Sequence, residues 1–297
     1  MREDRLRTLV ETRIREPEAI AQAAAARRRP AAPVDEDGRA MIVAADHPPR
    51  GFLGPATRPL AMADRADLLD RLCLALSRPG VTGVLGAPDI VEDLLLLGAL
   101  EGKVVFGSMN RGGLAGATWE LDDRFTAYDA ASIERMGYEG GKMLTRIDLE
   151  DPATAGTVEA CARAVGELAD RRLVAMIEPF MSTRKDGRVA NVLTTEAAIK
   201  ASTIAAGLGT TSAYTWLKIP VVEDMAAVAA ATTLPTVLLG GEVREDQEAF
   251  FETWRSALAV PNVIGMVVGR SLLYPADDDV AAAVDTVVGL FPGKVAS

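Results

Sequence analysis

The chain has 297 residues, 49% of them hydrophobic, so it can bury a substantial core as one large α/β domain or two smaller ones. Its formal net charge is -10 and its pI is about 4.8, which argues against nucleic acid as a partner because such binding needs a basic surface. No apolar run is long enough to span a bilayer, and the charged segment 1–16 lacks the core of a signal peptide. We therefore expect a cytoplasmic protein that contacts neither nucleic acid nor membrane.

Residues 1–39 precede the periodic part of the chain and form the first of two predicted units. The segment 3–29 has an amphipathic helical pattern rich in Ala, Arg and Glu, and Pro17 is expected to divide it into two helices. A polar linker rich in Pro, Asp and Gly follows at 30–39. We interpret this unit as a helical extension that packs on the outside of the second unit, 40–297, or at a subunit contact of a homo-oligomer.

From Ala40 onward, short apolar runs alternate with amphipathic segments, as in a parallel sheet covered by helices on both faces. The predicted strands are 40–45, 82–85, 103–106, 142–147, 173–178, 214–220, 236–239 and 263–268. The predicted helices are 63–76, 87–100, 153–169, 196–208, 222–231, 245–259 and 277–290. Eight such units predict an α/β fold, the (β/α)8 TIM barrel. A doubly wound open sheet is the alternative, but no glycine fingerprint follows the first strand.

Lys218 ends the sixth predicted strand and is the first candidate for covalent chemistry. Only 6 of the 32 basic residues are lysine. Unlike arginine, lysine becomes a neutral amine that attacks carbonyls when burial or a nearby cation lowers its pKa. Asp46 and Glu178 end the first and fifth strands, at the face where barrels carry their active sites, and are expected to move protons. The alternative for Lys218 is an ammonium group that simply reaches solvent.

Three charged residues of the fourth predicted strand, Lys142, Arg146 and Asp148, are separated by even numbers of positions. Even spacing places side chains on one side of a strand, here the barrel interior. Buried charges must pair or serve a site. One interpretation is a structural ion-pair network. The other is that Lys142 is a cation near Lys218 that lowers the pKa of its amine.

Glycines after the last two strands predict a phosphate site. Gly240-Gly241 follows the seventh strand and Gly269-Arg270 the eighth, where barrels often bind phosphate with backbone N–H groups and a helix N-terminus. The glycines allow close approach, and the guanidinium adds a charge-assisted contact. His47 and Arg146 are further candidate substrate contacts, although His47 equally suits a residue that hydrogen-bonds within its own loop.

The sequence argues against a metal site. It has one histidine and no HxxxH pair or CxxC motif, so zinc- or iron-type ligand spacing is lacking. Cys73 and Cys161 fall within helical patterns and are expected to be free thiols. We expect no metal and no cofactor.

The segments around these candidates resemble class I (Schiff-base) aldolases of the (β/α)8 fold, in the superfamily of tagatose-bisphosphate and archaeal-type fructose-bisphosphate aldolases. The resemblance covers about 41–274 in six short segments: Ala45-Asp46-His47 with Arg50-Gly51, Lys142-Met143-Leu144, Ile177-Glu178-Pro179-Phe180, Leu217-Lys218-Ile219-Pro220-Val221, Gly240-Gly241, and Val268-Gly269-Arg270. It implies that Lys218 forms the imine, that Lys142 is the second lysine, and that Asp46 and Glu178 are the strand-end acids. Glu178 matches an acid used by tagatose-type members, where archaeal members tend to have tyrosine.

The resemblance also implies that Gly241 and Arg270 belong to the phosphate loops. Two features depart from the family pattern: the stiff sequence His47-Pro48-Pro49, and the basic loop at 184–188. Both departures bear on the substrate more than on the lysine.

We therefore predict a metal-independent class I aldolase, an aldehyde-lyase that cleaves or forms a carbon–carbon bond in a phosphorylated keto-sugar through a lysine Schiff base. A deoxy-keto-sugar phosphate such as the inositol-pathway intermediate is one candidate substrate. Two alternatives stay open. One is a thiolase-like or other carbon–carbon lyase acting on a non-sugar phosphate. The other is a catalytically silent barrel that binds a sugar phosphate and regulates a partner.

Overall fold

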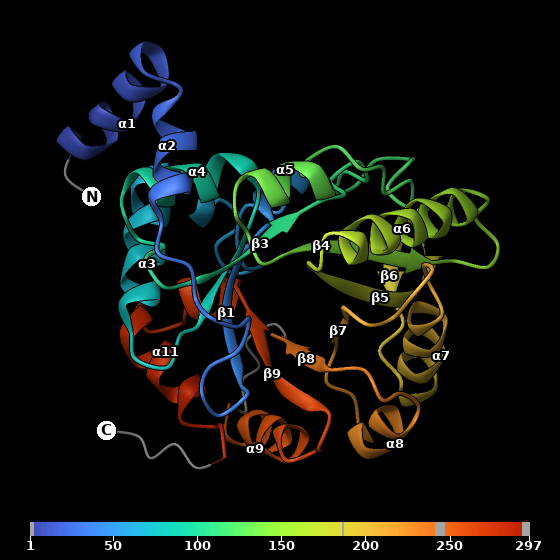
Figure 1. The fold of residues 1–297 in the computed structure, drawn as a ribbon. Helices are drawn as coiled ribbons and strands as arrows, with labels where there is room; N and C mark the ends of the chain where they lie inside the picture. Colours follow the sequence, from blue (N-terminus) through green and yellow to red (C-terminus); the bar gives the residue numbers. More distant parts are fainter. Residues whose placement is uncertain (1–2, 186, 241–246, 293–297) are drawn as a thin grey trace.

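A computed structural model of the chain describes residues 3–185, 187–240 and 247–292 (Figure 1). Its centre is a closed barrel of eight parallel strands: β1 Ala40–Ala45, β2 Gly83–Gly86, β3 Val104–Ser108, β4 Gly140–Ile147, β5 Val174–Lys185, β7 Thr215–Ile219, β8 Thr236–Leu239 and β9 Val263–Val268. Each strand pairs with its neighbour in that order, and β9 pairs back onto β1 with Ala40 opposite Gly265. This closure confirms the predicted (β/α)8 barrel and rejects the open sheet.

Alternate strand residues divide the core into two layers. One layer faces the helices and includes Met41 and Val43, whereas the other fills the barrel and includes Ile42 and Phe106. This alternation is the period-2 pattern of a strand. Inside the barrel the ring centroids of Phe106 and Trp216 lie 5.8 Å apart. The apolar filling lies beneath a polar layer at the carboxyl ends of the strands, so the barrel is a packed support for that layer.

Helices surround the barrel at every predicted position. They are α3 Arg65–Ser77, α4 Pro88–Leu96, α6 Ala153–Asp170, α7 Thr195–Ala206, α8 Met225–Ala230, α9 Gln247–Leu258 and α11 Val280–Val288. Several begin at a side-chain cap; for example, Asp64 accepts hydrogen bonds from the backbone N–H groups of Ala66 and Asp67. The sequence did not predict α5 Ala130–Arg135, α10 Arg270–Leu273, the short 3-10 helices Pro48–Arg50 and Ala61–Ala63, or the strand β6 Arg188–Asn191. In the basic segment predicted as a loop at 184–188, Arg184 and Lys185 instead extend β5 and pair with Val189 and Arg188 of β6, and residue 186 lies outside the described residues.

The N-terminal segment forms two helices, α1 Glu3–Arg15 and α2 Ala19–Ala26. The first ends before Pro17 and the second begins after it, as predicted. They project from the outside of the barrel near α4 (Figure 1). The buried guanidinium of Arg27 secures the end of α2, because it donates 2.6 Å bonds to the carbonyls of Lys103 and Gly137 and pairs with Glu139. The proposed subunit contact stays a prediction.

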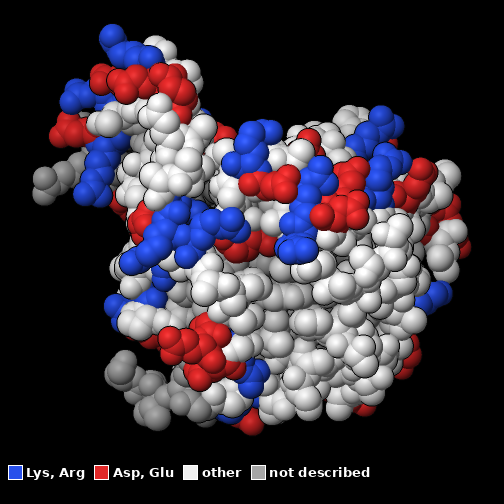
Figure 2. Space-filling model, viewed as in Figure 1, with Lys and Arg blue, Asp and Glu red and all other residues white. Residues whose placement is uncertain are grey.

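On the face shown in Figure 2, charged side chains of both signs gather over the upper and left parts, a broad area at the lower right carries few, and no basic patch dominates. Across the described ranges, no helix has both the length and the apolarity needed to cross a bilayer.

Candidate active site

Four side chains from four strands form a buried charged cluster at the carboxyl end of the barrel. Lys218 on β7 donates to Glu178 on β5, with 2.6 Å between Nζ and Oε1. Lys142 on β4 contacts the other oxygen of Glu178 and lies 2.9 Å from Oδ2 of Asp46, which follows β1. Both lysines are at most 3% exposed. The structure thus brings together all four residues that the sequence singled out for catalysis; their chemical roles stay predictions.

Strand geometry explains how this cluster is built. On β4, Lys142 and Arg146 point into the barrel, whereas Met143 packs in the helix-facing core and the hydroxyl of Thr145 lies 3.1 Å from the thiol of Cys161 on α6. This agrees with the even spacing seen in the sequence. Asp148 is the exception, because β4 ends at Ile147 and the Asp148 carboxylate instead accepts the backbone N–H of Glu150 in the following turn.

The charges in the cluster stabilise one another. Burial raises the pKa of Glu178, but Lys142 and Lys218 outweigh that effect and bring it to about 2. Burial also raises the pKa of Asp46, and Lys142 and Arg111 hold it well below its usual range. The opposite holds for Lys142: burial lowers its pKa, although Asp46 and Glu178 counteract this. Near neutral pH the two carboxylates are therefore fixed anions, and the pKa of Lys142 lies below that of a free lysine amine.

Two residues that follow β3 belong to the site and were assigned no role from sequence. Arg111 donates to the backbone carbonyls of Asp46 at 2.7 Å and Asn110 at 2.9 Å, and its Nη2 lies 3.3 Å from Oδ2 of Asp46. The Asn110 side-chain amide exchanges two hydrogen bonds with the backbone of Leu144, of 2.6 and 2.8 Å. The sequence showed that Asn110 and Arg111 follow a predicted strand, but it did not show which groups they contact.

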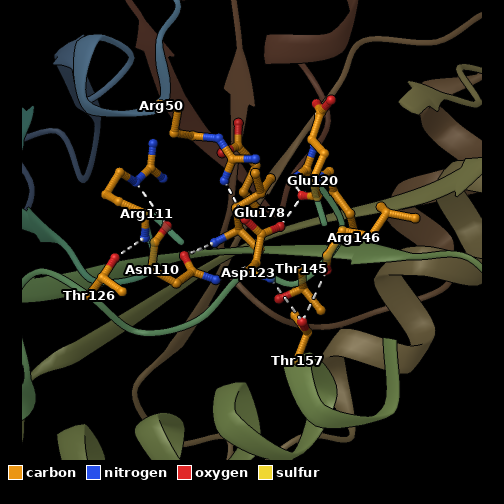
Figure 3. Close-up of polar contacts among 12 residues, drawn as sticks. Arg50, Asn110, Arg111, Glu120, Asp123, Thr126, Thr145, Arg146, Thr157 and Glu178 are labelled. Carbon is orange, nitrogen blue, oxygen red and sulfur yellow. Dashed lines mark hydrogen bonds and ion pairs between the residues drawn. The ribbon is translucent and has the colours of Figure 1, made fainter. Parts of the chain in front are cut away.

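A second buried network lies beside the lysine cluster and is built on arginine. Arg146 donates from Nε to Asp123 at 2.9 Å and from Nη1 to Glu120 at 3.0 Å, and a further bond reaches the Glu120 carbonyl (Figure 3). Arg50, from the loop after β1, contacts the other oxygen of Asp123. Arg146 thus holds the β3 loop through these contacts. Its predicted role as a substrate contact stays a prediction.

The predicted phosphate loops are described in part, because Gly241 lies outside the described residues. A Cβ at Gly240 would lie 2.5 Å from a methyl group of Val268, and one at Gly269 would lie 2.5 Å from the carbonyl oxygen of Ala44. Close packing of β8, β9 and β1 thus already requires both glycines. The Arg270 guanidinium lies 5.8 Å from the ring centroid of Phe52. A phosphate role for these residues stays a prediction.

His47 sits at the edge of the lysine cluster. Its Nδ1 lies 3.8 Å from Oδ1 of Asp46, too far for a hydrogen bond. Burial lowers the pKa of this imidazole to about 3, against the attraction of Asp46. His47 is therefore neutral at physiological pH. Within the parts of the chain that the structure describes, no three His, Cys, Asp or Glu side chains are grouped so as to hold a metal ion.

The closed barrel and its buried lysine–carboxylate cluster define a (β/α)8 protein with a charged site at the carboxyl ends of the strands. A family model described as Cgl0159-like matches residues 38–288, so the chain belongs to the Cgl0159-like family. The crystal structure of Cgl0159 from Corynebacterium glutamicum is 51% identical, with a TM-score of 0.94 over 98% of this chain and 97% of that one. A search among curated proteins returned no match.

Fructose-bisphosphate aldolases share the fold at much lower identity. An archaeal fructose 1,6-bisphosphate aldolase is 19% identical, with a TM-score of 0.65 over 88% of this chain and 96% of that one. The fructose-bisphosphate aldolase from Slackia heliotrinireducens is 15% identical, with a TM-score of 0.59 over 87% of this chain and 88% of that one. The expected relation to archaeal-type aldolases is therefore confirmed as a likeness of fold.

Proposed function

We propose that this protein is a class I aldolase that cleaves or forms a carbon–carbon bond in a phosphorylated keto-sugar through an imine on Lys218. One observation carries the proposal: two buried lysines share one carboxylate, with Lys218 on Oε1 of Glu178 and Lys142 on Oε2. A purely structural ion pair needs only one lysine. A second cation beside the first favours loss of a proton from one of the two amines, and a neutral amine is the nucleophile that imine formation requires.

The chemistry follows from these positions. The neutral Lys218 amine adds to the substrate ketone, and the former carbonyl oxygen takes up a proton and leaves as water, which yields a protonated imine. The bond between the carbon adjacent to the imine carbon and the next, hydroxyl-bearing carbon then breaks. Its electron pair becomes the carbon–carbon double bond of an enamine, and the π pair of the iminium moves onto nitrogen. The proton of the adjacent hydroxyl group passes to the enzyme, and an aldehyde leaves. Protonation of the enamine and hydrolysis by water release the ketone and return Lys218.

Lys142 is the group best matched to carry the proton. Asp46 and Glu178 are held as anions by their low pKa values and are weak bases, whereas burial lowers the pKa of Lys142 and makes its ammonium group a better proton donor. Lys142 also contacts both carboxylates, so it can pass a proton without leaving the cluster. This assignment refines the expectation that the carboxylates themselves move protons.

The phosphate of the substrate is proposed to lie against Gly240, Gly241, Gly269 and Arg270, with the neutral imidazole of His47 beside it. Lys218 would supply the electron sink, so the reaction is proposed to need neither a metal nor a cofactor. Activity after exhaustive treatment with a chelator checks this: loss that a divalent ion restores would overturn it.

Borohydride trapping tests the central step. Reduction in the presence of substrate should leave a stable adduct on the peptide that contains Trp216-Leu217-Lys218. Lys218→Arg keeps the charge near Glu178 but removes the nucleophile, so it should abolish trapping and lower turnover by about 1,000-fold or more. Arg163→Lys, on the exposed face of α6, serves as the control. An adduct on Lys142 would exchange the two lysine roles. Ligand binding with no adduct in the wild-type protein would instead favour the silent barrel.

A further inference from the structure

Two buried arginines at the barrel mouth have donor groups that are not used within the described chain. Arg50 is 4% exposed and Arg111 is 6% exposed, and the Nη2 atom of each is buried without a hydrogen-bond acceptor among the residues the structure describes. Buried guanidinium donors are costly to leave unpaired. Neither atom has a role in the proposed imine chemistry.

The remaining atoms of both guanidinium groups are fixed. Arg50 uses Nη1 for Asp123, and Arg111 uses Nε and Nη1 for the carbonyls of Asn110 and Asp46. The Nη2 of Arg111 lies 3.3 Å from Oδ2 of Asp46 without the alignment of a hydrogen bond, and that oxygen already accepts from Lys142. Each arginine is thus held in place by the protein while one amino group stays available.

The two side chains also share one electrostatic environment. Burial lowers the pKa of Arg50, Asp123 raises it, and repulsion by Arg146 and Arg111 lowers it again. Figure 3 shows Arg50 and Arg111 as neighbours that enter from the loops after β1 and β3. Among the buried side chains of the two networks, the cations Arg50, Arg111, Lys142, Arg146 and Lys218 face four carboxylates, Asp46, Glu120, Asp123 and Glu178. When the imine on Lys218 is protonated and Lys142 carries its proton, five positive charges face these four carboxylates.

We propose that Arg50 and Arg111 form a second oxyanion subsite, distinct from the Gly240–Arg270 loops, which binds a second anionic group of the substrate, a carboxylate or a phosphate. The inference rests on the proposed function, because it takes Lys218 as the centre of the site. Arg111 lies at the far end of a chain of contacts that runs from Lys218 through Glu178, Lys142 and Asp46. Guanidinium groups suit this task because their planar N–H donors match an oxyanion in pairs.

Three ketose phosphates of equal chain length, ending in a carboxylate, a second phosphate or a hydroxyl group, provide the test. For the wild-type protein, kcat/KM should be about 10- to 100-fold higher for at least one anion-ended compound than for the hydroxyl-ended one. The better of the two anions identifies the group. Equal or better use of the hydroxyl-ended compound would overturn the subsite.

Arg50→Lys and Arg111→Lys keep a positive charge beside Asp123 and Asp46 but lose the second amino group. Each should remove most of the preference for the anion-ended compound and reduce the hydroxyl-ended reaction far less. Arg163→Gln, at the exposed pair with Glu159, should change neither. An equal loss on all three compounds in a folded variant would assign these arginines a structural role and overturn the proposal.

A binding measurement separates this inference from the imine. Inorganic phosphate should raise the unfolding temperature of Arg270→Ala, in which the other predicted anion contact is removed, at constant ionic strength. It should not do so for Arg270→Ala combined with Arg50→Lys. This result would uphold the subsite even if borohydride trapped nothing on Lys218. Equal stabilisation of both variants, or of neither, would overturn the subsite whatever the trapping result.

Discussion

Two buried polar networks lie side by side in this barrel, and they use different cations. The network on β4, β5 and β7 is built on Lys142 and Lys218, and the network under the β3 loop is built on Arg146 and Arg50. Lysine changes its protonation state when buried, whereas arginine keeps its charge and holds carboxylates in a fixed geometry. We therefore expect a division of labour, in which the lysines carry out the proposed chemistry and Arg146, together with Nη1 of Arg50, holds the β3 loop through Asp123.

The largest expected contrast comes from Lys142→Met. The substitution leaves Asp46 with Arg111 and Glu178 with Lys218, so the fold should persist. Loss of the proposed proton carrier should lower kcat by about 10²- to 10⁴-fold, while borohydride still traps an adduct on Lys218 at a reduced rate. A small added amine should restore part of the activity. Full activity in this variant would remove Lys142 from the mechanism.

Substitution in the arginine network should lower stability and not the imine chemistry. Arg146→Met takes the ion-pair partner from Glu120 and one of two partners from Asp123, all of them buried. The free energy of unfolding should fall by about 3–5 kcal/mol, measured by urea denaturation, while trapping on Lys218 survives in the protein that stays folded. Arg124→Gln is a matched control in the same loop, because Arg124 is 77% exposed, and it should cost about 1 kcal/mol or less. Loss of borohydride trapping in folded Arg146→Met would contradict the assignment of Arg146 to a structural network separate from the lysines.

Arg270 tests whether an arginine at the rim acts on substrate. Its guanidinium lies near the ring of Phe52 and donates a long hydrogen bond to the Gly54 carbonyl, so it is held by weaker contacts than the guanidinium of Arg146. If it binds the substrate phosphate, Arg270→Ala should raise KM for phosphorylated substrate by about 10- to 100-fold. An unchanged ratio between phosphorylated and unphosphorylated substrates would show that Arg270 only supports the β1 loop.

The smallest effect concerns pH and His47, the single histidine of the chain. Its pKa falls from 6.5 to about 3 on folding, so below pH 6.5 the unfolded chain binds a proton that the folded chain does not. The stability contributed by the neutral imidazole is complete above pH 6.5 and declines as the pH falls toward 3. At pH 5 the wild type should lose about 2 kcal/mol more than His47→Gln, relative to pH 7.5. Parallel curves for the two proteins would contradict the buried neutral imidazole.

Much of this architecture follows from sequence because its signals are local. Apolar runs locate the strands, and even spacing on β4 places Lys142 and Arg146 inside the barrel. The partners of these charges are not local. Asp123 and Glu120 lie in the long segment between β3 and α5, which lacks periodicity, so nothing in the sequence connects them with Arg146. Sequence likewise does not reveal that contacts with Val268 and the Ala44 carbonyl already require Gly240 and Gly269, whatever their predicted phosphate role.

The closure of β9 onto β1 has a consequence for how the protein is made. Ala40 pairs with Gly265, so β1, the first barrel strand to be synthesised, cannot form this pairing until β9, the last one, has been made. Until then both strands expose unpaired edges, and the cluster that joins Asp46 to Lys218 has no closed barrel around it. Such long-range pairing is slow and leaves the incomplete chain prone to aggregation. Early docking of α2 through Arg27, whose partners lie no further along than Glu139, would protect one side of the nascent chain during that delay.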